Sequence, residues 1–171
     1  MNKLFLRLRG RNGAESIPMS ETLRRIVEIR RQGKLWIVGF IADQVPLWNN
    51  IHLWLDFLHH DTPVFTGSER IARKFDSDVY YLDIRRERRG YYLARFVLMA
   101  EHAASQPEGE LTRSYFSLLE KSIRRQPAFY LWTHNRWKRT HEEYNIRYDE
   151  ETGRVDMGDL DEIKRRKGIA K

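Results

Sequence analysis

The sequence predicts an α/β protein with a mixed, largely parallel sheet flanked by helices. Three observations lead to this prediction. Residues 35–42 are a continuous apolar run rich in β-branched and aromatic residues, residues 111–126 repeat apolar residues at helical spacing, and residues 79–84 and 91–99 have the composition of paired strands. The chain has 171 residues, 41% of them hydrophobic, which suffices for one packed domain.

The first element is a helix over residues 20–30. Ser20 is a suitable N-cap, apolar residues follow at helical spacing, and Gly33 ends the helix. The apolar run 35–42 comes next and is apolar on both faces, which is typical of a central strand in a covered parallel sheet. Asp43 and Gln44 then fall at its carboxyl end, where open α/β sheets bind ligands, although a turn or helix cap is an equally good interpretation.

Residues 45–64 are interpreted as a long, partly apolar loop that contains a short helix or strand. Loops of this length are uncommon in compact domains and are often functional. Residues 67–75 predict a short helix with a basic exposed side. The strands 79–84 and 91–99 predict a hairpin, the helix 111–126 ends before Pro127, and a last hairpin is expected at 149–154. The predicted organisation is a domain over residues 1–139 followed by a polar tail over residues 140–171.

The net charge is +7 and the pI is about 9.8. Residues 138–171 carry nine basic and nine acidic residues, so the excess lies in residues 1–137. Phosphate, anionic lipid or nucleic acid would each suit such a chain, and a solvated basic face would equally explain its clusters. Much of the excess lies in two clusters: Lys3, Arg7, Arg9 and Arg11, and Arg85, Arg86, Arg88 and Arg89.

Several classes of function are excluded or disfavoured. The chain has no cysteine, which rules out disulfides and Cys-ligated metals. The longest apolar run has eight residues, far below the roughly 20 that span a bilayer. His59-His60-Asp61 lacks a second group of ligands at regular spacing, so we expect no metal site and no cofactor. No signature of a nucleic-acid-binding fold occurs, and we expect no nucleic-acid partner.

Several short motifs occur in a fixed order over residues 6–138. They are Arg9-x-Arg11-x-Gly13, Asp43-Gln44 after the apolar run, Thr66-Gly67-x3-Ile71-Ala72-Arg73-Lys74, Arg124-x2-Pro127, and Leu131-Trp132-x-His134-x-Arg136-Trp137-Lys138. Together they resemble the bacterial lipid A biosynthesis acyltransferases, the lauroyl and myristoyl transferases of the lysophospholipid acyltransferase superfamily.

The resemblance implies an α/β acyltransferase that is peripheral to the cytoplasmic side of the inner membrane. Such enzymes move a fatty acyl group from acyl carrier protein, or from acyl-CoA in relatives, to a hydroxyl of a lipid A precursor or a lysophospholipid. The resemblance also implies that residues 48–65 meet an acyl chain or the membrane. A noncatalytic module that binds anionic lipid or phosphate is the alternative.

The expected substrate-binding residues follow from the same resemblance. An arginine guanidinium forks onto phosphate oxygens through charge-assisted hydrogen bonds, which suits an anionic substrate group. In the Leu131–Lys138 motif, Trp132, His134, Arg136 and Trp137 suit either a structural role or the stacking and binding of a phosphate. The expected substrate-binding residues are Arg9, Arg11, Asp43, Gln44, Thr66 and Gly67.

The family's catalytic motif is absent from the sequence. That motif is His-x4-Asp or His-x4-Glu, in which the histidine is the general base on the acceptor hydroxyl and the carboxylate orients it. The residues five places after the six histidines are Phe57, Val64, Phe65, Pro107, Arg139 and Ile146, none of them acidic. We therefore expect an incomplete glycerolipid-acyltransferase-like domain, the C-terminal portion of the family's domain, with no catalytic residue in this chain and no activity of its own.

Overall fold

The computed structural model describes residue 7 and residues 10–169, so Arg9 lies outside the described residues. The chain divides into two compact units, Met1–Gly39 and Phe40–Lys171. In the first, a 3-10 turn η1 (Met19–Glu21) leads into α2 (Thr22–Arg31), which confirms the first predicted helix. The N-cap prediction is wrong, because Ser20 lies within η1 and no side chain caps α2.

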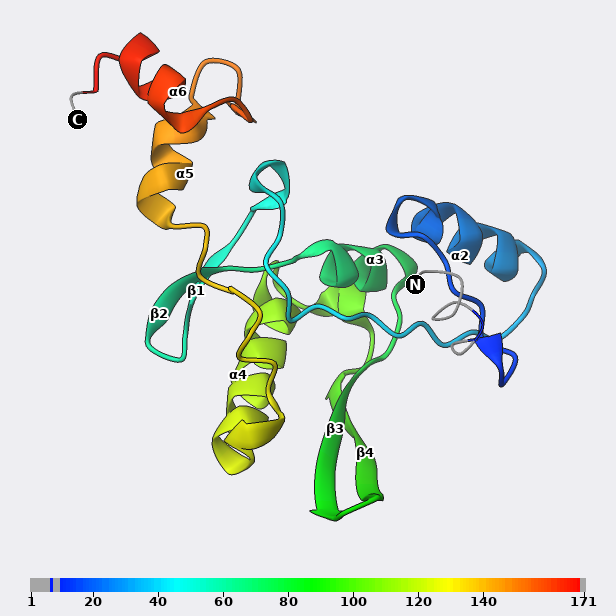
Figure 1. The fold of residues 1–171 in the computed structure, drawn as a ribbon. Helices are drawn as coiled ribbons and strands as arrows, with labels where there is room; N and C mark the ends of the chain where they lie inside the picture. Colours follow the sequence, from blue (N-terminus) through cyan, green and yellow to red (C-terminus); the bar gives the residue numbers. More distant parts are fainter. Residues whose placement is uncertain (1–6, 8–9, 170–171) are drawn as a thin grey trace. The chain divides into compact units, whose positions relative to one another are not determined.

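The second unit mixes helices and strands (Figure 1). Its elements are η2 (Trp48–Asn50), β1 (Trp54–Phe57), β2 (His60–Pro63), α3 (Gly67–Phe75), β3 (Val79–Arg88), β4 (Tyr91–Ala100), η3 (Ala103–Ser105), α4 (Glu110–Arg125), η4 (Pro127–Phe129), α5 (His141–Arg147), β5 (Tyr148–Asp149), β6 (Arg154–Val155) and α6 (Leu160–Arg166).

The predicted mixture of helix and strand is confirmed, but the large parallel sheet is not found. The described strands form three separate antiparallel pairs, β1–β2, β3–β4 and β5–β6. The central strand expected at residues 35–42 is wrong: this segment has no strand structure, and Leu35 and Ile37 are almost fully exposed. A strand needs a neighbour for its backbone N–H and C=O groups, and no described strand pairs with this segment.

Most local predictions are confirmed. The hairpin predicted at 79–84 and 91–99 is β3–β4, the helices at 67–75 and 111–126 are α3 and α4, and the hairpin at 149–154 is β5–β6. The segment interpreted as a long loop contains a helical turn, η2, and a complete hairpin, β1–β2. The boundary at residue 139 stays a prediction.

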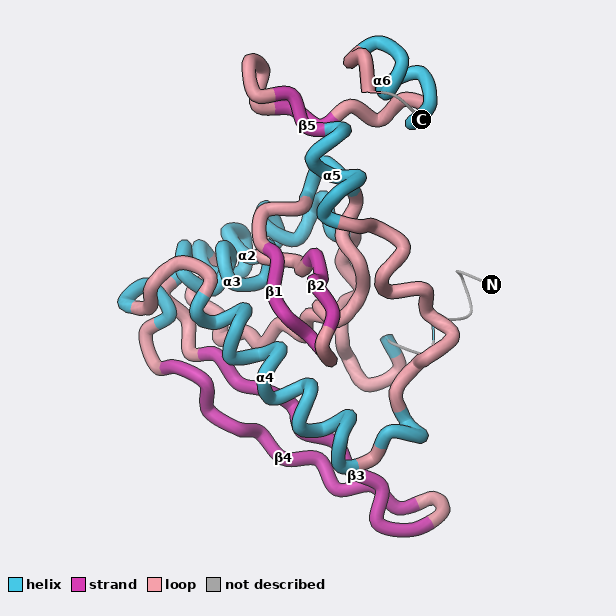
Figure 2. Tube along the Cα trace, turned by 90° about the vertical axis from the view of Figure 1, so that its left-hand side faces the viewer, coloured by secondary structure: helices cyan, strands magenta, loops and turns pink. Residues whose placement is uncertain are grey.

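The main core lies between α4 and the β1–β2 hairpin. Phe57 of β1 and Phe116 of α4 meet edge to face, with ring centroids 5.1 Å apart. Leu55, Val64 and Ile123 complete this buried cluster. The other side of α4 carries the β3–β4 hairpin, which runs along the helix (Figure 2). Both hairpins thus take their positions from one amphipathic helix.

A polar network fixes the β3–β4 hairpin to the C-terminal half of α4. Arg125 donates two hydrogen bonds to the Asp83 carboxylate, at 2.5 and 3.1 Å, and the Ser122 hydroxyl donates a third at 3.1 Å. The buried Tyr81 donates its phenol proton to the Ser122 hydroxyl at 2.9 Å. The hydrogen bonds from Arg125 hold the pKa of Asp83 below its ordinary value, with Ser122 acting in the same direction.

We predict that Asp83→Asn lowers the urea midpoint of unfolding at pH 7. A carboxylate whose pKa is lowered on folding stabilises the folded state above its unfolded pKa of about 4, and this stabilisation is lost as the pH falls through the folded-state pKa. The difference between wild type and variant should therefore narrow below about pH 4. Asp56→Asn, at an exposed position of β1, is the control. Equal midpoints of wild type and Asp83→Asn at pH 7 would contradict the prediction.

Candidate functional site

A buried arginine organises the segment that carries the Leu131–Lys138 motif. Arg136 is 1% exposed, and its guanidinium donates to the backbone carbonyl oxygens of Asp43 and, at 3.5 Å, Pro63. Its Cζ lies 5.4 Å from the ring centroid of Phe57 and 5.1 Å from that of Phe116. Burial lowers the pKa of Arg136. The side chain thus ties together the Asp43 loop, the end of β2 and the main core.

Neighbouring residues of the motif reinforce these connections. The Val45 amide donates to Nε2 of His134 at 3.5 Å, and Nε1 of Trp137 donates to the Thr62 hydroxyl at 2.9 Å. Trp132 donates to the Pro127 carbonyl at 2.7 Å. The polar groups of these side chains therefore contact protein groups, which favours the structural interpretation of the motif.

Asp43 stands among three tyrosines as well as Arg136. Burial is the main cause that raises the pKa of Tyr81, Tyr115 and Tyr130, and the negative charge of Asp43 raises each of the three further. Asp43 itself is half-buried, whereas Gln44 is exposed. The negative charge of Asp43 thus acts on three tyrosines and partly balances the buried guanidinium charge.

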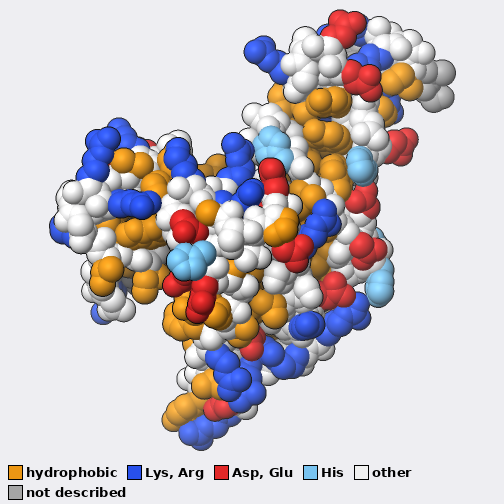
Figure 3. All heavy atoms as spheres, turned by 180° about the vertical axis from the view of Figure 1, so that it is seen from behind, with side chains coloured by type: hydrophobic (Ala, Val, Ile, Leu, Met, Phe, Trp, Pro, Cys, Tyr) orange, Lys and Arg blue, Asp and Glu red, His pale blue; other side chains and the backbone are white. Residues whose placement is uncertain are grey.

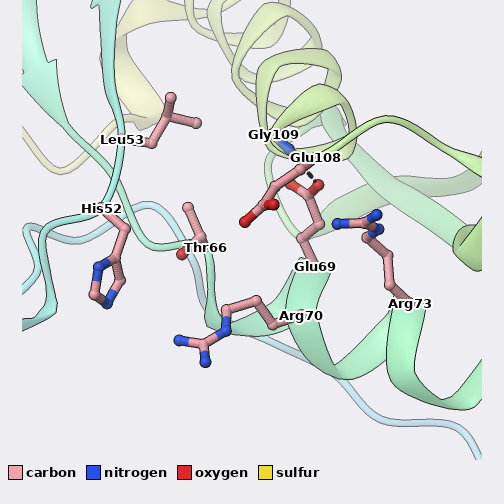
Figure 4. A pocket seen from close by; sticks show the side chains of 8 residues that line it. All are labelled: His52, Leu53, Thr66, Glu69, Arg70, Arg73, Glu108 and Gly109. Atoms are coloured by element: carbon pink, nitrogen blue, oxygen red, sulfur yellow. Dashed lines mark hydrogen bonds between the residues drawn. The ribbon is translucent and has the colours of Figure 1, made fainter.

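A hollow of about 440 Å³ lies between α3, the start of β1 and the start of α4. Figure 4 shows side chains that line this hollow. Arg70 and Arg73 belong to α3, and Thr66 is the residue before that helix. His52 belongs to the segment before β1, and Glu108 precedes α4. The hollow therefore combines two guanidinium groups, a hydroxyl and an imidazole with an acidic residue.

Glu69 forms the inner wall of this hollow and is fully engaged. Its buried carboxylate accepts from the backbone amides of Gly109 at 2.6 Å and Thr112 at 3.0 Å, and from the Thr112 hydroxyl. These donors belong to the first turn of α4, where amides have no partner within the helix. Glu69 therefore holds α4 in place, whereas the Nε atom of Arg73 is buried without a hydrogen-bond partner in the described structure.

The six expected substrate-binding residues are divided between the two units. Thr66 lines the hollow and Gly67 begins α3, exposed and with open space beside its Cα. Asp43 and Gln44 belong to the second unit as well, while Arg11 is an exposed turn residue of the first unit. Arg9 lies outside the described residues.

The residues that line the hollow beside Thr66 were not among the substrate-binding residues expected from the sequence. Arg70 and Arg73 follow Thr66-Gly67 on the same helix, three residues apart, so helical spacing alone places them on one face. Glu69 carried no sequence signal of its own, because its partners lie 40 residues further along the chain.

Within residues 10–169, no three His, Asp or Glu side chains are grouped so that they could hold a metal ion. None of the described helices combines the length and apolar character that crossing a membrane requires.

The sequence profile of the bacterial lipid A biosynthesis acyltransferases matches residues 1–139. The chain therefore belongs to this family, as the order of its motifs predicted. The match includes the hollow, the Asp43 loop and the Arg136 segment, and it ends before α5. A comparison with curated proteins gives no match.

We predict that Arg136→Met destabilises the protein by about 3 kcal/mol, because two hydrogen bonds from a charged donor are each worth about 1.5 kcal/mol. Arg136→Lys should recover only part of this loss, since its single ammonium nitrogen lacks the two spaced Nη groups with which Arg136 reaches the two carbonyl oxygens. The measurement is the free energy of unfolding in urea. Lys138→Met, at an exposed position of the same segment, should change it by less than about 0.5 kcal/mol. A loss in Arg136→Met no larger than in this control would contradict the prediction.

Proposed function

We propose that this chain serves the transfer of a fatty acyl group to a hydroxyl of a lipid A precursor or a lysophospholipid. The acyl donor in this proposal is acyl carrier protein or acyl-CoA. The observation that carries the proposal is the family match over residues 1–139. The hollow beside Thr66 supports it, because an anionic lipid acceptor needs cationic donors on the protein.

In this proposal the hollow binds a phosphate of the acceptor. Arg70 and Arg73 supply guanidinium donors, Thr66 supplies a hydroxyl, and the Arg73 Nε atom still lacks a partner. Glu69 does not compete for these cations, since it is committed to α4. The exposed Glu108 does compete, because its carboxylate lines the same hollow.

The remaining expected residues contribute further contacts to the substrate in this proposal. Arg9 and Arg11 would contact a further anionic group of the substrate, which their residue type and their place in the family pattern support. Asp43 and Gln44 would line the substrate path next to the tyrosines. The proposed location is the cytoplasmic side of the inner membrane, with peripheral attachment, and the net charge of +7 suits an anionic surface.

We further propose that the chain by itself does not catalyse the transfer. Acyl transfer needs a general base on the acceptor hydroxyl, and no histidine of the sequence is followed at the family's spacing by a carboxylate. The same observation favours the second candidate function, a noncatalytic module that binds anionic lipid or phosphate through the same hollow.

The test is the binding of lysophosphatidic acid, dispersed in a nonionic detergent, to the purified chain. Arg70→Gln and Arg73→Gln should each weaken binding about tenfold, since a charge-assisted hydrogen bond is worth about 1.5 kcal/mol. Glu108→Gln should tighten binding, because it removes the competing carboxylate. Lys74→Gln, exposed on the same helix but outside the hollow, should leave the Kd unchanged. Equal affinity of all four variants would refute the binding site.

A second arm of this experiment addresses catalysis. The chain is incubated with acyl carrier protein or CoA thioesters and a lipid A precursor, and acylated product is measured. We expect none. Turnover that is lost on substitution of one of the six histidines would overturn the proposed inactivity and would favour the enzyme over the binding module.

A further inference from the structure

The β3–β4 hairpin has one covered and one uncovered face. Tyr81 and Asp83 point to α4, as their bonds to Ser122 and Arg125 establish. Side chains alternate along a strand, so the residues between them point the other way. Six large apolar residues share this second face, which we call the outer face, with exposed fractions from 44% to 67%: Tyr80, Leu82, Ile84, Tyr92, Phe96 and Leu98.

The strand register confirms that these residues form one surface. Tyr80 lies opposite Leu98, and Leu82 lies opposite Phe96. The rings of Tyr80 and Phe96 meet edge to face, with centroids 6.3 Å apart. A contiguous apolar surface is unusual on a soluble protein and marks an interaction site.

The tip of the hairpin, residues 85–91, is strongly basic. Arg85, Arg86, Arg88 and Arg89 stand against one acidic residue there, Glu87, which pairs with Arg85 at 3.5 Å. Arg88 lies over the ring of Tyr91, 3.7 Å from its centroid. Figure 3 shows basic and hydrophobic side chains together on this protruding part of the molecule.

We propose that the outer face and the tip of the β3–β4 hairpin form the surface that binds an anionic lipid bilayer. The charge complementarity carries this assignment: arginines attract anionic headgroups, aromatic rings settle at headgroup level, and aliphatic side chains enter the acyl region below. Leu82, Ile84 and Leu98 would gain nothing from a nucleic acid, whose backbone is anionic but whose bases need stacking partners. The inference rests on the proposed function, because a lipid acceptor has to be reached at a membrane.

The chain offers a direct probe of insertion, since it contains no cysteine. Phe96→Cys and Lys121→Cys are each labelled with a fluorophore whose emission shifts to the blue in an apolar environment. Lys121 is exposed on α4 and serves as the control. The probe membrane is vesicles of phosphatidylcholine with about one third phosphatidylglycerol, compared with pure phosphatidylcholine. We expect a blue shift at position 96 with the anionic vesicles only, and no shift at position 121.

Cosedimentation with the same vesicles distinguishes the contribution of the basic tip from that of the apolar outer face. Arg88→Gln with Arg89→Gln should weaken binding by at least about tenfold and flatten its salt dependence, since each arginine near an anionic surface contributes severalfold. Tyr92→Ser with Phe96→Ser should weaken binding but keep its salt dependence. Leu131→Ser, 61% exposed elsewhere in the unit, should bind like wild type. Circular dichroism of each variant verifies that it is folded.

Three results would overturn the inference: vesicle binding that the hairpin variants do not change, a hairpin-dependent binding of DNA without binding of vesicles, or a dimer that these variants dissociate and that does not bind vesicles. The vesicles contain no acyl acceptor, and the hollow is tested in detergent without a bilayer. A failure at the hairpin is therefore distinguishable from a failure of the proposed function, and the hairpin variants should bind lysophosphatidic acid in detergent like wild type.

Discussion

The guanidinium of Arg136 is the constraint on which the site depends. A buried cation is costly unless hydrogen bonds and opposing charge compensate for its lost hydration. Here two backbone carbonyls, the faces of Phe57 and Phe116, and the charge of Asp43 provide that compensation. One carbonyl belongs to the Asp43 loop and the other to Pro63 at the end of β2, so satisfying one side chain fixes both segments. Thr66 of the hollow follows Pro63 by three residues.

Helix α4 connects the segments held by Arg136 to the rest of the second unit. Its first turn is held by Glu69, which at the same time closes the hollow. Its middle supplies Phe116 to Arg136 and to the core, and its end holds the β3–β4 hairpin through Ser122 and Arg125. The proposed phosphate site is therefore held at the first turn of α4, and the proposed membrane surface is held at the last turns of the same helix.

Local pattern predicted the elements well and their assembly poorly. The period of α4 and the alternation of β3–β4 are visible in the sequence because each is set by neighbouring residues. Residues 35–42 have the composition of a buried strand, but a strand also needs a partner, and partners are not encoded locally. Among the residues that line the hollow, only Thr66 was an expected substrate-binding residue. Glu69 and Arg136 act through partners 40 to 93 residues away in the sequence, and no local pattern reveals such pairings.

Nitrogen-15 NMR of the arginine side chains tests the central claim most directly. The Nε–H group of Arg136 is buried and lacks a partner in the described structure. Its proton should therefore exchange with water much more slowly than the corresponding protons of the exposed Arg88 and Arg89. Substitution at Phe116 should accelerate this exchange. An Arg136 Nε–H that exchanges as fast as those of the hairpin tip would contradict this claim, because the Asp43 loop and the end of β2 would then have no buried cation to hold them.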